Sequence, residues 1–108
     1  QSQHEETIKK VILFVRENFA EPITVADAAV VTEYSSAHFM RFFKQETGRT
    51  FIEYLTDYRL GFASYLLKES SDPISVIAGK CGFDNFSYFI RVFKRRYGMS
   101  PGKYRTGR

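Results

Sequence analysis

The sequence predicts an all-α fold of about seven helices, arranged as two helix-turn-helix units that are joined by a long connecting helix. Apolar residues recur at helical spacing along most of the chain, and no alternating strand pattern competes with them. Residues that favour helix starts (Ser, Thr, Asp, Asn) and helix ends (Gly, Pro) separate these segments. With 108 residues, 44% of them hydrophobic, the chain can bury a core. The third observation is a motif that occurs twice.

The first two helices are expected before residue 32. Glu21 and Pro22 end the first one, because a residue that precedes proline disfavours the helical conformation. Thr24 and Asp27 have the spacing of a capping box, which predicts a short helix near residues 24–31. The first helix has an apolar stripe at Ile8, Val11, Ile12, Val15 and Phe19.

The next two helices have equally clear local signals. Ser35 is expected to cap a helix over residues 36–47 that stops at Gly48. Thr50 opens the long connecting helix near residues 51–69 through a second capping box. The apolar positions expected on the connecting helix are Phe51, Leu55, Tyr58, Phe62, Tyr65 and Leu66.

Three further helices are expected in the last third of the chain. The segment 70–73, rich in Ser and ending in Pro, breaks the connecting helix, and a short helix follows at once. A longer helix is capped by Asp84 or Asn85 and ends at Gly98. Ser100, followed by a proline, starts a brief last helix.

A ten-residue pattern, F-x-R-x-F-K-x-x-x-G, spans residues 39–48 and returns at residues 89–98. In each copy a short helix precedes the patterned helix and carries an alanine, Ala29 or Ala78, which lets two helices cross closely. This is the plan of a helix-turn-helix, whose second helix enters the DNA major groove. The expected division of the chain is a first unit over 1–50, the connecting helix over 51–69 and a second unit over 70–108.

The patterned helices are expected to have one buried and one exposed face. Their phenylalanines form the apolar stripe, whereas Arg41 and Arg91 lie elsewhere on each helix. An arginine at such a place can donate two hydrogen bonds to guanine, and a lysine one turn later, such as Lys44 or Lys94, suits a phosphate.

The distribution of charge favours a polyanionic partner. The net charge is +4, and between Asn85 and Arg108 there are seven basic residues and no acidic one. Such asymmetry is typical of nucleic-acid binding. A helical protein-interaction module, with a basic face for an acidic partner, remains an alternative.

Other functional classes find no support in the sequence. No apolar run reaches the roughly 20 residues that a membrane-spanning helix needs. His4, His38 and Cys81 are far apart in the chain, so we expect no metal site, no cofactor and no catalytic activity. A single cysteine suits the reducing cytoplasm.

The repeat lies within a wider set of matching residues. In the second half these are Ile77, Ala78, Gly82, Phe83, Asp84, Tyr88, Phe89, Arg91, Phe93, Lys94, Gly98, Ser100, Pro101, Tyr104 and Arg105. In the first half they are Ser35, Arg41, Phe43, Lys44, Glu46, Thr47, Gly48, Tyr54, Leu55, Arg59 and Ala63. With them the sequence, from about Ile8 to Arg105, resembles the DNA-binding domain of the AraC/XylS family of bacterial transcription regulators.

This resemblance implies sequence-specific binding of double-stranded DNA, with the two patterned helices in successive major grooves. It also implies an activator that contacts RNA polymerase in the cytoplasm. We expect this fragment to be monomeric, and a sensing or dimerising domain to be missing from it.

The resemblance also assigns site residues. The positions that match base readers are Ala37, Met40, Arg41, Ser87, Tyr88 and Arg91. The expected phosphate contacts are Ser35, Ser36, His38, Lys44, Asn85, Lys94 and Lys103. Ala37 and Met40 depart from the large polar side chains often found at such positions, so the first unit is expected to read fewer bases. Glu33 stands where the second copy has Gly82, and is expected to be strained if the turn needs a positive φ.

Overall fold

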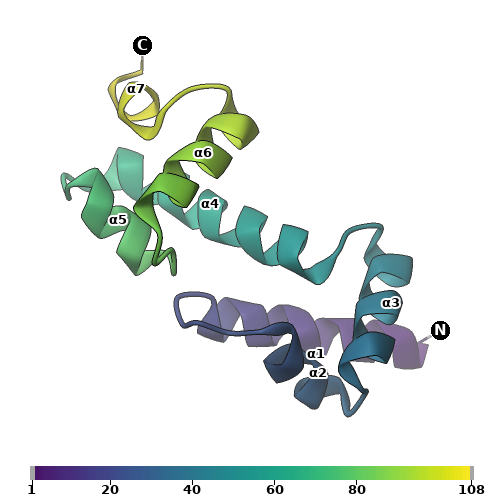
Figure 1. Cartoon of the computed structure of the whole chain (residues 1–108). Helices are drawn as coiled ribbons and strands as arrows, with labels where there is room; N and C mark the ends of the chain where they lie inside the picture. The colour runs from purple at the N-terminus through teal and green to yellow at the C-terminus, as the bar shows by residue number, and fades with distance from the viewer. Residues whose placement is uncertain (1, 108) are drawn as a thin grey trace. The chain divides into compact units, whose positions relative to one another are not determined.

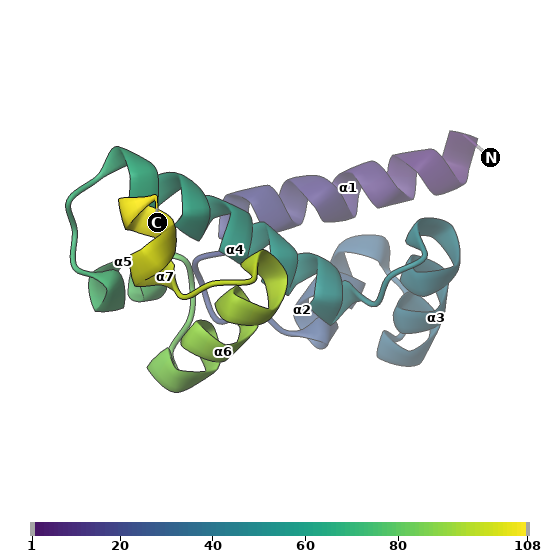
Figure 2. The ribbon, with the colours of Figure 1, turned by 90° about the horizontal axis from the view of Figure 1, so that it is seen from above.

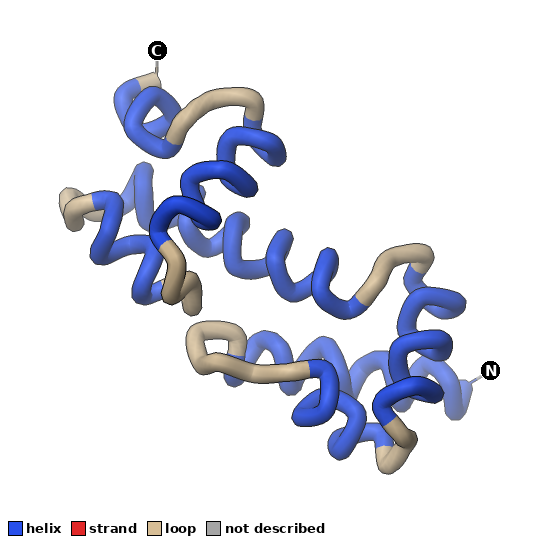
Figure 3. The backbone as a smooth tube through the Cα atoms, viewed as in Figure 1, coloured by secondary structure: helices blue, strands red, loops and turns tan. Residues whose placement is uncertain are grey.

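Helices form all the regular secondary structure in the residues that the computed structural model describes, 2–107 (Figures 1 and 3). They are α1 (Ser2–Asn18), α2 (Val25–Thr32), α3 (Ser36–Thr47), α4 (Phe51–Glu69), α5 (Ile74–Lys80), α6 (Phe86–Tyr97) and α7 (Pro101–Thr106). The predicted all-α fold is therefore confirmed. The chain separates into two compact units, one ending at Asp57 and one beginning at Tyr58, so that α4 contributes residues to both. None of the described helices is long and apolar enough to cross a membrane.

The first unit packs α1 against α2 and α3 and includes the start of α4 (Figure 1). Phe39 and Phe43 of α3 are completely buried, and the ring of Phe51 meets both of them edge-on at centroid distances of 5.3 and 5.7 Å. Edge-to-face packing of this kind adds to the free energy of burial. The other buried apolar residues of this unit are Val11, Val15, Ala28, Ala29, Phe42 and Leu55.

The predicted helix caps are present. Thr24 and Asp27 form the capping box of α2, in which each side chain accepts the backbone N–H of the other residue, at 3.1 and 2.9 Å. Thr50 and Glu53 do the same at the start of α4, at 3.0 and 2.9 Å. At the end of α3, Gly48 has a φ of 81°, a left-handed conformation that glycine adopts without a steric penalty.

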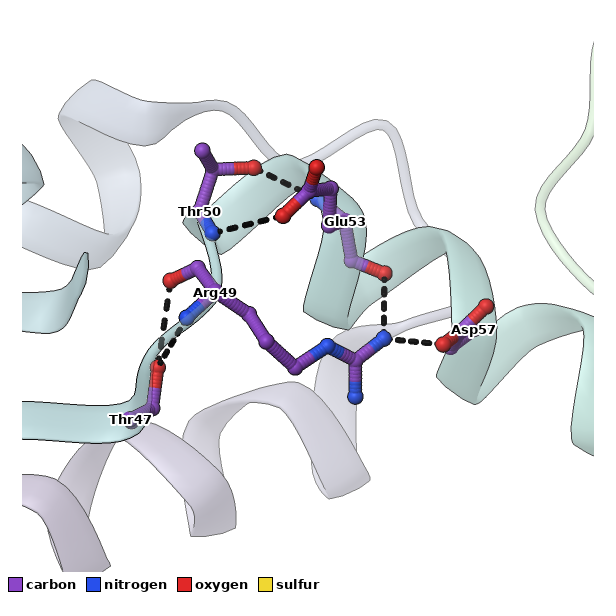
Figure 4. A network of polar contacts seen from close by, with 5 residues as sticks. All are labelled: Thr47, Arg49, Thr50, Glu53 and Asp57. Atoms are coloured by element: carbon purple, nitrogen blue, oxygen red, sulfur yellow. Dashed lines mark hydrogen bonds and ion pairs between the residues drawn. The ribbon is translucent and has the colours of Figure 1, made fainter.

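A polar network connects the end of α3 to the start of α4 (Figure 4). The guanidinium of Arg49 forms an ion pair with Asp57 and also donates to the backbone carbonyl of Glu53 at 3.3 Å. The hydroxyl of Thr47 accepts the backbone N–H of Arg49 at 3.2 Å. These contacts hold the loop between the two helices in place. All of them lie within the first unit, and none of the residues that form them is buried.

The second unit gathers α5, α6 and α7 around the C-terminal half of α4 (Figures 1 and 2). Phe89 and Phe93 of α6 are completely buried, and the ring of Phe93 lies 4.6 Å from that of Tyr97 and 5.4 Å from that of Tyr104. The other buried residues of this core are Leu60, Ala63, Leu67, Ile77, Ala78, Cys81, Phe83 and Val92.

Arg105 of α7 holds the C-terminal end of α4 and the loop that follows it. Its guanidinium donates to the backbone carbonyls of Leu67, Ser70 and Asp72, at 3.0, 3.0 and 2.7 Å. The last carbonyls of a helix have no partner within the helix, so these bonds satisfy groups that would otherwise need water.

The apolar face predicted for α4 is partly wrong. Phe51 and Leu55 are buried as expected, but Tyr65 is 58% exposed, whereas Leu60 and Leu67 are buried instead. Phe62 and Leu66 are only partly buried against the second core. The step of five residues from Leu55 to Leu60 turns a helix by about 140° beyond one full turn, so a single stripe cannot hold all the buried positions.

The turn between α2 and α3 has the positive φ on which the predicted strain at Glu33 depends. Glu33 caps α2 in the left-handed region, with φ 65°, and it is the one non-glycine among the described residues with a positive φ. The expected strain at Glu33 is therefore real.

Candidate nucleic-acid interface

The two faces of α3 have opposite characters. Phe39, Phe42 and Phe43 are buried, while Met40 on the other side is 48% exposed. Ala37, Arg41 and Lys44 are exposed together with it. Residues spaced at i, i+3, i+4 and i+7 share one side of a helix, so these four side chains form a continuous exposed strip.

The beginning of α3 is held by its cap and by an aromatic stack. The hydroxyl oxygen of Ser35 accepts the backbone N–H of His38 at 3.1 Å, which leaves the hydroxyl hydrogen free to donate elsewhere. The ring of His38 lies flat on that of Tyr34, at a centroid distance of 4.0 Å. Ser36 is exposed beside them. The three residues expected to contact phosphate at this helix start, Ser35, Ser36 and His38, therefore lie close together.

The corresponding helix of the second unit, α6, also has a buried and an exposed side. Ser87, Tyr88 and Arg91 are exposed. The guanidinium of Arg91 lies 5.3 Å from the ring centroid of Tyr88, a cation–π contact that restrains both side chains. Ile90 differs from its counterpart Met40, because it packs against the core of its unit.

The remaining residues expected at phosphates are at the two ends of α6 and on α7. The side-chain oxygen of Asn85 accepts the backbone N–H of Tyr88 at 2.9 Å, and its amide NH₂ stays available as a donor. Lys94 and Lys103 are exposed. The last turn of α6 also carries Arg95 and Arg96, so this end of the helix concentrates positive charge.

Sequence reasoning missed one exposed aromatic residue at this surface. Phe86, the first residue of α6, is 46% exposed, although its ring centroid is only 6.3 Å from that of Phe89. Its position next to a helix cap and outside the apolar stripe could have predicted this exposure.

Two cavities adjoin the exposed strip of α3. One, of about 400 Å³, is lined by Val25, Met40, Arg41, Lys44, Gln45, Thr50, Phe51 and Ile52. The other, of about 370 Å³, is lined by His4, His38, Arg41, Phe42, Gln45 and Glu46, and Nδ1 of His4 lies 3.3 Å from Oε2 of Glu46 there. No sequence pattern predicts either cavity, because each one forms between residues of separate helices.

Two chemically distinctive residues of the second unit are Cys81, which is buried, and Arg59, which is partly buried. Burial raises the pKa of the Cys81 thiol to about 12, against an opposing effect of the Arg59 charge. Burial also lowers the pKa of Arg59, while the charge of Asp84 opposes this. Among the described residues, no three His, Cys, Asp or Glu side chains gather where they could hold a metal ion.

Known proteins share this arrangement. A family model described as a helix-turn-helix domain matches residues 28–107. The uncharacterized HTH-type transcriptional regulator YpdC of Escherichia coli K12 is 34% identical over 91 residues, which are 84% of this chain and 32% of YpdC. The multiple antibiotic resistance protein MarA of Escherichia coli K12 is 30% identical over 99 residues, which are 92% of this chain and 78% of MarA.

A solved structure is also similar over most of the chain. The DNA-binding domain of AdpA, a global transcriptional factor solved in complex with a target DNA, superposes with a TM-score of 0.87 and 29% identity. The match covers 92% of this chain and 89% of that domain. The chain spans about a third of YpdC and most of MarA, and the family model covers well over half of it. The chain belongs to the helix-turn-helix domains of AraC-type transcription regulators.

Proposed function

We propose that this chain binds double-stranded DNA in a sequence-specific manner, with α3 and α6 entering successive major grooves. One observation carries the proposal: each unit presents a helix whose phenylalanines are buried and whose other side exposes an arginine and a lysine one turn apart. A major groove accepts a helix of this kind, and base edges and phosphates are the groups that such side chains bind.

The two helices differ in how many base-specific hydrogen bonds their side chains can form. On α6, Ser87, Tyr88 and Arg91 all carry hydrogen-bonding groups. On α3, Arg41 is the one polar side chain among the three proposed readers, since Ala37 and Met40 can only contact an apolar group such as the thymine methyl. The second unit therefore contributes more discrimination between bases.

The proposed phosphate contacts surround these readers. They are Ser35, Ser36, His38, Lys44, Asn85, Lys94 and Lys103. The capping residues Ser35 and Asn85 lie at helix N-termini, where backbone N–H groups and the helix dipole favour an anion.

In the cell, the domain acts within a bacterial transcription regulator in the cytoplasm. We infer an activating role through contact with RNA polymerase, and binding of this domain to DNA as a monomer. Sedimentation of the free and the DNA-bound chain measures the monomeric state directly, and transcription in vitro with purified polymerase measures activation.

Selection of bound fragments from random DNA, followed by hydroxyl-radical footprinting, tests the central proposal. Two units on one duplex protect two adjacent major grooves on one face, a site of roughly 20 base pairs. A footprint confined to one groove would show that a single unit reads DNA. Equal affinity for selected and scrambled duplexes would show that the chain binds DNA without sequence specificity.

A further inference from the structure

The cavity lined by Val25, Met40, Phe51 and Ile52 has the form of a small-molecule site. Its volume of about 400 Å³ lies within the range of pockets that hold small ligands. It opens between the start of α2, the exposed strip of α3 and the first turn of α4. Its apolar walls come from Val25, Met40, Phe51 and Ile52.

Two of the four polar residues at this cavity are cationic, Arg41 and Lys44, and the other two are Gln45 and Thr50. Arg41 and Lys44 both line it, and among the described residues neither side chain forms a hydrogen bond or an ion pair. Glu53, an acidic residue whose charge interacts with that of Lys44, has its pKa lowered chiefly by a backbone hydrogen bond from Thr50 and also by the charge of Lys44. Because the Glu53 carboxylate accepts the backbone N–H of Thr50 at 2.9 Å, it is engaged in the cap of α4. Glu53 is not among the residues that line the cavity, so the charged side chains of the lining, Arg41 and Lys44, are both positive.

We propose that this cavity binds a small amphipathic carboxylate, one with a rigid apolar body and a single negative charge. The body fills the space between Met40, Phe51 and Ile52, and the carboxylate forms charge-assisted hydrogen bonds with Arg41 and Lys44. A sugar or an inorganic phosphate would leave the apolar walls uncovered, and a neutral apolar molecule would gain no charge-assisted hydrogen bond from the exposed Arg41 and Lys44.

Binding of this ligand opposes DNA binding. This second step rests on the proposed function, because Arg41 and Lys44 are also the proposed contacts of α3 with a base and a phosphate. A carboxylate held between them neutralises their charge and occupies their donors. Ligand and DNA then exclude each other at the first unit, and the site gives the domain a means of regulation by a small anion.

The first experiment needs no DNA. 2-Naphthoate is titrated into the chain, and backbone amide shifts are followed by NMR, with the uncharged 2-naphthamide as the matched probe. We expect naphthoate to shift the amides of residues 40–45 and 50–53, and naphthamide to bind about tenfold more weakly. Shifts spread over both units, or equal affinity for the two probes, would overturn the proposal.

Three variants separate the cavity from the DNA surface. Ile52 is 49% exposed, so Ile52→Ala leaves the core intact; it weakens naphthoate binding severalfold and leaves DNA affinity unchanged. Arg41→Gln weakens both. Arg91→Gln, at the matching position of α6, weakens DNA binding alone. Unchanged naphthoate affinity in both Ile52→Ala and Arg41→Gln would show that the ligand does not use this cavity.

Competition is measured last, by titrating a selected DNA site in the presence of naphthoate. The apparent Kd for DNA rises in proportion to one plus the ratio of naphthoate concentration to its Kd, and this rise is much weaker in Ile52→Ala. Unchanged DNA affinity in saturating naphthoate would overturn the mutual exclusion. If the ligand-free chain binds no DNA, the proposed function fails, whereas the NMR titration still decides whether the cavity takes a carboxylate.

Discussion

Glu33 and Gly82 hold the same place in the two turns of the repeat, 49 residues apart, and both have a positive φ, 65° and 93°. The backbone N–H of each donates to the carbonyl three residues earlier, Val30 or Gly79, at 3.1 Å in both cases. The turn thus demands a left-handed residue in both copies, and only the second copy supplies the residue that adopts it without strain.

Glu33→Gly is expected to raise the free energy of unfolding by about 1 kcal/mol, because the left-handed conformation costs a side-chain-bearing residue roughly that much. Chemical denaturation of the two proteins measures the difference. Glu33→Gln is the matched control, since it removes the charge and keeps the strain. A gain of equal size in Glu33→Gln would assign the effect to charge instead.

Gly61→Ala is expected to stabilise the protein by about 0.5 to 1 kcal/mol. Gly61 lies inside α4, and a methyl group added to it meets nothing within 4 Å apart from its chain neighbours and the adjoining backbone of its own helix. Alanine lowers the conformational entropy of the unfolded chain and favours the helix, so the substitution raises the free energy of unfolding without a steric clash. Gly48→Ala is the contrasting variant, because Gly48 has a φ of 81°. Thermal unfolding should show opposite shifts, and a fall in Tm for Gly61→Ala would contradict this reading of α4.

Arg105→Ala is expected to destabilise the second unit by about 2 to 4 kcal/mol. Its guanidinium donates to three backbone carbonyls, and hydrogen bonds from a charged group contribute more than neutral ones. Lys103→Ala, two residues earlier on the exposed side of α7, should change stability by less than about 0.5 kcal/mol. Urea unfolding compares the two, and similar losses would mean that the three bonds contribute little.

The Cys81 thiol is expected to be almost inert in the folded protein. With a pKa of about 12, only about one thiol in ten thousand is ionised at pH 8, and the thiolate is the reactive form. A disulfide reagent should therefore react slowly with native protein and at once in denaturant. Because folding raises this pKa, the protonated thiol makes its full contribution to the free energy of unfolding below about pH 9. That contribution is lost as the pH rises towards 12. Fast reaction of the native protein would place Cys81 outside the core.

Arg91→Ala and Lys94→Ala are expected to affect DNA binding in different ways. Loss of a bidentate arginine removes about 1 to 3 kcal/mol of discrimination at one base position. Loss of a lysine that contacts phosphate weakens all sequences alike and lowers the salt slope by about one. Binding to cognate and scrambled duplexes across a salt series tells them apart. If Arg91→Ala weakens both duplexes equally, Arg91 contacts the backbone.

Most helix boundaries follow from the sequence because their determinants are local, although α1 ends at Asn18, before the predicted end at Glu21 and Pro22. The capping pairs Thr24–Asp27 and Thr50–Glu53 join residues three apart, and the hydrogen bonds that define them depend on little else. A tight turn has the same local character, so the strain at Glu33 could be foreseen.

The parts that sequence reasoning could not supply depend on neighbours distant in the chain. Leu67 replaces Tyr65 in the core because α4 serves two units, and helical periodicity alone assumes one continuous buried face. Met40 and Ile90 share a position in the repeat, yet one is half exposed and the other packs inward. The assignment of individual base and phosphate contacts stays a prediction that the binding experiments address.

The division of α3 and α6 into a buried and an exposed side also bears on how such a domain acquires new targets. The phenylalanines that hold each helix in place are not the residues that we assign to base reading. Ala37, Met40, Ser87 and Arg91 can therefore be exchanged at little cost to folding, so the preferred operator can drift while the scaffold stays intact. An evolving regulator of this design can be retargeted step by step, without passing through unfolded intermediates.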